Sequence, residues 1–235
     1  MKKTGVAFIT GVGPGLGAAL ARRFAHGGFA IGLVARHADF IEQLAREISG
    51  SGGKAIGVVA DVSRPGEVQS AVRRVRAELG KINLLLHNAS ASSGHGLLGT
   101  TPEEFERAWR IATLGGFVAA RETAPDMIGA GAGAMLFTGA TSSVRGGGWL
   151  AFSSAKFALR GLAQSLAREL WPQGVHVAHV VVDGSIGRAG EASPPNEPEL
   201  DPDRMADAYW HLAGQDRRAW TLELDLRPNG EKFFE

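Results

Sequence analysis

The sequence has no cysteine and a single tyrosine, Tyr209, among its 235 residues. The missing thiol excludes disulfides and thiolate metal sites, and it leaves the redox compartment undetermined. No tract of one charge sign stands out, since 25 basic side chains stand against 24 acidic ones. That balance gives no electrostatic reason to expect binding to nucleic acid or to anionic membranes. No spacing of side chains typical of a metal site is present either.

Long hydrophobic runs are also missing, and no stretch is long enough to span a bilayer. The opening residues, MKKTGVAFITGVG, have two lysines before an apolar run, as a signal peptide does. However, the run is short and glycine interrupts it, so we interpret it as a strand. We therefore expect a cytoplasmic protein.

Glycine, by contrast, is abundant: the 33 glycines cluster where apolar runs give way to amphipathic ones. Short apolar runs and longer amphipathic runs alternate along the whole chain, which predicts alternating strands and helices. The predicted strands are 5–10, 29–35, 54–60, 82–87, 134–139, 175–182 and 219–227. The predicted helices are 15–28, 38–48, 63–79, one starting near 101–104, 151–171 and 199–212.

This order predicts an α/β fold of Rossmann type, a doubly wound parallel sheet of about seven strands with helices on both faces. We expect a single domain over residues 1–235. The segment GEASPPNEPELDP, residues 190–202, lies inside that domain. We interpret it as part of a mobile loop near residues 187–202 on the substrate side.

The first strand runs directly into TGVGPGLG, residues 10–17. A phosphate-binding turn needs glycine where the backbone bends sharply or lies against the ligand, followed by a helix N-terminus that presents N–H groups to the anion. The context of strand, turn and helix is the one that such a motif requires. The alternative is an ordinary glycine-rich turn between a strand and a helix.

The end of the second strand carries information about the nucleotide. An acidic residue there would bind a ribose hydroxyl pair, whereas an arginine would accept a 2′-phosphate. Here the strand ends with Arg36 and His37, and no acid precedes Asp39. This favours NADP over NAD, unless Arg36 is simply a solvated surface residue.

Five motifs in order resemble the short-chain dehydrogenase/reductase family, and the likeness covers nearly the whole chain. They are the TGxxxGxG-like loop at 10–17, ADV at 60–62, HNAS at 87–90, SSAK at 153–156 and VVDGSI at 181–186. The resemblance implies an NADP- or NAD-dependent oxidoreductase acting on an unidentified small molecule, and a homodimer or homotetramer. The cofactor-binding residues that it implies are Gly11, Gly13, Gly15, Leu16, Gly17, Arg36, Asp61, Val62, Asn88, Ala89, Lys156, Gly184 and Ile186.

The same resemblance places the family's catalytic groups on four positions, and this sequence departs at three. The tyrosine acid/base falls on Phe152, the serine on Gly139 and the asparagine on Ala112, while Lys156 is kept. Asp183 stands where proline is usual. We therefore predict Lys156, Phe152 and Gly139 as the catalytic corner, with small, open positions at Gly139 and Ala112.

Other groups near that corner are weaker candidates. Serine and threonine hydroxyls at residues 141–143 and at 153 and 154 donate hydrogen bonds but are poor bases. His95 follows the fourth strand, and histidine as a residue type suits proton transfer near neutral pH, but a loop histidine among serines and glycines also fits a plain surface position. His176 and His179 fit a structural role within the sixth strand. Trp149 fits either a substrate pocket or the core, and Trp171 and Trp210 fit packing at helix ends.

Two functional hypotheses follow from this pattern. The first is a reductase that delivers hydride to a small carbonyl or activated alkene without the usual tyrosine. The second is a catalytically inactive NADP(H)-binding sensor or partner subunit on the same fold. Removal of a general acid/base costs about 10²–10⁴-fold in rate, so the usual alcohol–ketone mechanism is not expected in either case.

Overall fold

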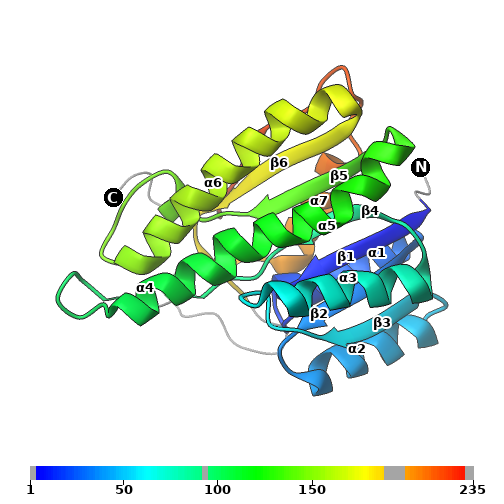
Figure 1. Cartoon of the computed structure of the whole chain (residues 1–235), viewed down its shortest axis with the longest axis horizontal. Helices are drawn as coiled ribbons and strands as arrows, with labels where there is room; N and C mark the ends of the chain where they lie inside the picture. Colours follow the sequence, from blue (N-terminus) through cyan, green and yellow to red (C-terminus); the bar gives the residue numbers. More distant parts are fainter. Residues whose placement is uncertain (1–3, 92–94, 188–198, 231–235) are drawn as a thin grey trace.

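The computed structural model describes residues 4–91, 95–187 and 199–230. Seven parallel strands form one sheet in the order β3-β2-β1-β4-β5-β6-β9 (Figure 1). These are β1 (Gly5–Thr10), β2 (Phe29–Ala35), β3 (Lys54–Val59), β4 (Ile82–His87), β5 (Gly133–Thr138), β6 (Val175–Val182) and β9 (Glu223–Leu226). The prediction of a doubly wound parallel sheet is confirmed.

The helices cover both faces of this sheet. They are α1 (Leu16–His26), α2 (Ala38–Gly50), α3 (Pro65–Leu79), α4 (Pro102–Trp109), α5 (Gly115–Ala130), α6 (Leu150–Leu170) and α7 (Pro202–Ala213). In Figure 1, α3, α5 and α6 lie in front of the sheet, and α1 and α7 lie behind it. In the described part of the chain, no helix has both the length and the apolarity to cross a membrane.

The strand sequences explain the two layers. Along β1, Val6 and Phe8 join the apolar core beneath α3, α5 and α6, whereas Ala7 and Ile9 join the core beneath α1, α2 and α7. A strand that is buried on both faces needs apolar residues at successive positions. The three consecutive leucines of β4 meet this need, because all three are buried. The strand order reverses between β1 and β4, and this switch point is where ligands bind in such sheets.

One predicted helix start is confirmed, and several other element bounds differ from the predictions, among them β9, which covers Glu223–Leu226 and not residues 219–227. The helix predicted from Thr101 does begin there, because Thr101 and Glu104 form a capping box. A π-helical turn, η1 (Arg110–Leu114), then separates α4 from α5. The late helix starts at Pro202, three residues later than predicted, with Asp201 as its N-cap. Glu199–Leu200 form strand β8, which pairs with β7 (Ser185–Ile186). Most of the predicted mobile loop lies outside the described residues.

Candidate active site

Two adjoining pockets of about 320 Å³ each open at the carboxyl ends of the parallel strands. They share Gly11, Gly13, Asn88 and Ser90, so they form one groove across the switch point. Four other predicted site residues line the first pocket, and they are Arg36, Asp61, Val62 and Ala89. The remainder line the second pocket: Gly15, Leu16, Gly17, Gly139, Phe152, Lys156, Gly184 and Ile186. All residues that the sequence analysis predicted for the cofactor site and for the catalytic corner thus line this one groove.

The glycine loop has the shape of a phosphate cradle. Gly11 has a φ of +71°, and a Cβ there would lie 2.5 Å from the backbone of Ala89. A Cβ on Gly17 would lie 2.7 Å from the carbonyl oxygen of Gly11. Gly13 is different, since a Cβ on it would meet no atom within 4 Å. Gly11 and Gly17 therefore allow the backbone of the turn to pack closely against its neighbours, and Gly13 leaves the groove free of side-chain atoms.

The start of α1 completes the cradle. Its first turn carries no acidic residue, and Gly15 at the N-cap offers no side chain to its N–H groups. The positive end of the helix is therefore left for an anion that lies over Gly13. Asn88 fixes the loop from β4, because its side-chain amide donates to the carbonyl oxygen of Gly11 at 3.0 Å. These residues fit the diphosphate of a nicotinamide dinucleotide.

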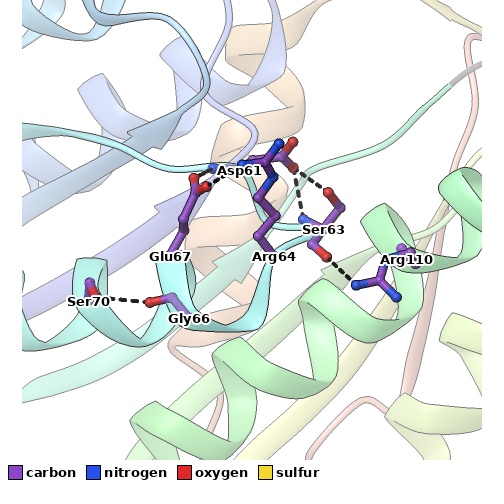
Figure 2. Close-up of polar contacts among 7 residues, drawn as sticks. All are labelled: Asp61, Ser63, Arg64, Gly66, Glu67, Ser70 and Arg110. Carbon is purple, nitrogen blue, oxygen red and sulfur yellow. Dashed lines mark hydrogen bonds and ion pairs between the residues drawn. The ribbon is translucent and has the colours of Figure 1, made fainter.

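Polar contacts fix Asp61 in the first pocket (Figure 2). Its Oδ1 accepts hydrogen bonds from the backbone N–H and the hydroxyl of Ser63 at 2.9 and 2.7 Å. Its own N–H donates to the Glu67 carboxylate at 2.8 Å. Burial raises the pKa of Asp61, but the Ser63 hydrogen bonds and the charges of Arg36 and Arg64 bring that pKa below its usual value. Asp61 is thus an ionised acceptor at the edge of the groove.

Lys156 and Phe152 lie one turn apart on α6 and face the second pocket. The Lys156 ammonium donates to the carbonyl oxygen of Thr138 at 2.8 Å and lies 5.5 Å from the centroid of the Phe152 ring. Burial lowers the pKa of Lys156 to about 8. This corner of the groove therefore holds a cation beside an apolar ring.

Comparison with known proteins agrees with this geometry. The family model described as short chain dehydrogenase matches residues 5–186. This chain belongs to the short-chain dehydrogenase family. Its relatives in that family are oxidoreductases, and the chain is an NAD(P)-dependent oxidoreductase of the short-chain dehydrogenase type.

Individual relatives cover most of the chain. A short-chain dehydrogenase/reductase from Armillaria gallica is 33% identical over 177 residues, which are 73% of this chain and 67% of the relative. A crystal structure of a short-chain dehydrogenase from Rhodopseudomonas palustris is 35% identical, with a TM-score of 0.85 and coverage of 95% and 98% of the two chains. An alcohol dehydrogenase from Thermococcus sibiricus, complexed with 5-hydroxy-NADP, is 26% identical, with a TM-score of 0.89 and coverage of 98% and 99%.

In this short-chain dehydrogenase, Gly139 is not the open position that the sequence suggested. Gly139 lines the second pocket, but a Cβ on it would lie 2.2 Å from Nε2 of His179 and 2.8 Å from the Ser143 hydroxyl. The space next to its Cα is therefore filled by a ring from β6. His179 is oriented by its Nδ1, which lies 3.1 Å from the Glu223 carboxylate, and Arg160 binds that carboxylate with two contacts of 2.7 Å.

Ala112 is not open either, because it is 2% exposed in a small cluster with Ala108, Ala151 and Ala155. Its carbonyl oxygen, in the π-helical turn, lies 2.9 Å from Nε2 of the buried His87. A carbonyl can only accept, so Nε2 carries the proton, and Nδ1 accepts from the Thr10 hydroxyl at 2.9 Å. Burial, aided by the charge of Lys156, lowers the pKa of His87 to about 4, so the ring is neutral.

Asp183 stands where proline was expected. It follows β6 and contacts residues that follow β5 and β9, beside the groove. Its carboxylate accepts from the Thr141 hydroxyl and pairs with Arg227, which also pairs with Asp225 at 2.8 Å. The interaction explains why an acidic residue is stable there although it is only 6% exposed.

Neither Tyr209 nor the weaker candidates line the two pockets, although some of them contact residues that do. Tyr209 is buried in α7, where its hydroxyl lies 2.9 Å from that of Thr138, and burial raises its pKa. His95 is exposed on its loop. Trp149 is half-exposed, and its ring centroid lies 5.9 Å from that of Phe152 in an edge-on arrangement, whereas Trp210 packs on Phe24 and Trp171 on Trp220.

Four further residues line the second pocket that the sequence analysis did not single out, namely Ser90, Thr138, Ala140 and Val182. Small and β-branched residues at strand ends carry no distinctive pattern.

Proposed function

We propose that this protein is an NADP-dependent reductase that transfers hydride to a small carbonyl or activated alkene without a tyrosine acid/base. The observation that carries the proposal is the second pocket, where Lys156 and Phe152 form a wall beside an intact glycine cradle. A phenyl ring neither gives nor takes a proton, so the usual tyrosine role is vacant at this wall. Bound NADPH would supply the hydride.

The chain's own residues have separable tasks in this scheme. The loop at Gly11–Gly17 and the start of α1 would hold the diphosphate, and Asp61 would accept from the adenine. Lys156 would hold the nicotinamide ribose, as its carbonyl-bound ammonium has two further N–H groups to donate. The apolar Phe152 and Ile186 would exclude water from the reacting end.

Preference for NADP is supported by the charge around the first pocket. Arg36 and His37 line it, and Asp61 is the acidic member of its lining. Asp61 already accepts two hydrogen bonds from Ser63, and the positive charge of Arg36 contributes to its lowered pKa. The similar alcohol dehydrogenase from Thermococcus sibiricus binds an NADP derivative. An arginine contact with a 2′-phosphate contributes about 1.5–3 kcal/mol.

The test is a fluorescence titration with NADPH and with NADH, followed by NADPH oxidation over a panel of ketones, diketones and enones. We expect saturable binding with NADPH preferred, and substrate-dependent oxidation. Arg36→Glu should weaken NADPH binding by about 10- to 100-fold and leave NADH binding almost unchanged. Arg46→Glu, on the exposed face of α2, is the control for the change in charge. Binding without turnover would favour a nucleotide sensor instead, and the absence of binding would overturn the proposal.

Self-association is a second part of the proposal. Four aromatic side chains on α4, α5 and α6 are about two-fifths exposed: Phe105, Trp109, Phe117 and Phe157. Such side chains on adjacent helices favour contact with a second copy of the chain. We expect a homodimer or homotetramer, and light scattering after size exclusion would give the mass directly.

A further inference from the structure

Lys156 is the one residue with a readily titratable side chain among those that line the second pocket. The rest of the lining is glycine, alanine, apolar side chains, Asn88, Ser90 and Thr138. Reduction of a carbonyl places negative charge on its oxygen, and that oxygen then needs a proton. The Lys156 ammonium is far more acidic than the Ser90 and Thr138 hydroxyls, so among the described residues of the lining it is the group suited to supply that proton, with a water molecule as the alternative.

The surroundings of Lys156 leave its ammonium able to release a proton. Its contact at 2.8 Å is the carbonyl oxygen of Thr138, which accepts a hydrogen bond but takes no proton. In the described part of the chain, no carboxylate lies within ion-pair distance of this ammonium. The side chain is 2% exposed, and burial without a counter-ion disfavours the charged form.

The described titratable groups nearest Lys156 are two buried histidines that carry no charge. His87 approaches from β4 and His179 from β6, and the positive charge of Lys156 contributes to holding both rings neutral. Farther along α6, Arg160 is paired with Glu223 of β9, so that carboxylate is already engaged. Among the described residues at this corner, Lys156 is thus a buried cation with no paired carboxylate, and losing its proton relieves the cost of burying a charge.

We propose that the Lys156 ammonium is the general acid of the reduction and takes the role that a tyrosine would have at position 152. This rests on the proposed function. As hydride from the nicotinamide cofactor forms a C–H bond, an N–H bond of Lys156 breaks and an O–H bond forms on the substrate oxygen. The substrate is reduced, the cofactor is oxidised, and the neutral amine of Lys156 regains a proton from water. An enone gains its proton on the same oxygen, as an enol.

This role is tested by the pH profile of kcat/KM. The substrate for this measurement is the compound of the panel that wild type reduces fastest. Wild type should be fastest below a pKa near 8 and lose about tenfold per pH unit above it. Lys156→Arg keeps the positive charge and the donors but does not titrate in this range. It should still show saturable NADPH binding, lose about 10²-fold in kcat/KM at saturating NADPH and show no inflection near pH 8.

Lys54→Arg is the matched control, because Lys54 also donates to a backbone carbonyl, that of Glu78 at 3.1 Å, but is exposed. This variant should keep both the rate and the profile of wild type. Retention of the wild-type rate and inflection by Lys156→Arg would overturn the role of Lys156. Wild-type protein that binds NADPH but reduces nothing on the panel, or that does not bind NADPH, would overturn the proposed function itself.

A readout independent of turnover is the NMR titration of protein labelled at the lysine side chains. The chain has six lysines, so the Lys156 signal is identified by its loss in Lys156→Arg. We expect that signal to titrate near pH 8. Titration at the ordinary value of about 10.4 would overturn the inference even if the variant were inactive.

Discussion

The imidazole of His179 fills the space that a side chain at position 139 would need. A Cβ on Gly139 would lie 2.2 Å from Nε2 and 2.4 Å from Cε1 of that ring. The ring is 1% exposed and is oriented from its other nitrogen by Glu223. Gly139 and His179 therefore depend on each other, because the His179 ring on β6 has room only if the residue directly after β5 is glycine.

Gly139→Ser should consequently destabilise the protein rather than simply restore a hydroxyl. The added atoms overlap a buried ring that Glu223 holds, and overpacking of this kind costs about 1–3 kcal/mol in the free energy of unfolding. Gly139→Ser combined with His179→Ala should recover most of that loss, because the obstacle is gone. Urea unfolding of the two single variants and the double variant gives the coupling energy.

Gly147→Ser is the control for this cycle, since a Cβ on Gly147 would meet no atom within 4 Å. It should unfold at nearly the wild-type urea concentration. Additive effects of Gly139→Ser and His179→Ala would show that the two positions are independent.

The sequence predicted the sheet, the glycine cradle and the lysine register because these depend on local patterns. Alternating apolar runs determine the strands, and a strand followed by glycines and a helix determines the cradle. The partners of His87 and His179 could not be predicted in this way. Each depends on a contact between residues far apart in the chain, such as Ala112 with His87 or Glu223 with His179, and a single histidine within a strand does not reveal its partner.

Phe152→Tyr should raise the reduction rate. The Lys156 ammonium lies 5.5 Å from the centroid of the ring at position 152, so a phenol there would have a cation nearby to lower its pKa. A positioned acid contributes about 10²-fold at the lower end of its range. Phe157→Tyr, on an exposed position of the same helix, is the control and should leave the rate unchanged. Equal rates for wild type and Phe152→Tyr would show that substrate oxygen does not lie beside position 152.

Stability should fall as the pH falls from about 6.5 to about 4. Burial lowers the pKa of His87 and of His179 from 6.5 to about 4, so in this window the unfolded chain binds more protons than the folded one. Each ring therefore contributes roughly 3 kcal/mol to the free energy of unfolding. This contribution is fully present above pH 6.5 and is lost as the pH falls toward 4. Urea unfolding across this range measures the slope. His87→Gln should reduce it by about half, and an unchanged slope in that variant would show that His87 does not titrate as inferred. His211→Gln, at an exposed position of α7, is the control.

Gly13→Ala should separate cofactor binding from folding. A Cβ on Gly13 meets no protein atom within 4 Å, so the free energy of unfolding should change by less than about 0.5 kcal/mol. The same methyl group extends into the groove where the diphosphate would lie, so NADPH binding should weaken by at least about tenfold. Gly11→Ala is the matched comparison, because its φ of +71° and its 2.5 Å approach to Ala89 make it destabilising in the absence of ligand. Thermal unfolding and NADPH titration of both variants distinguish the two effects. Wild-type affinity in Gly13→Ala would mean that the diphosphate does not lie over the glycine loop.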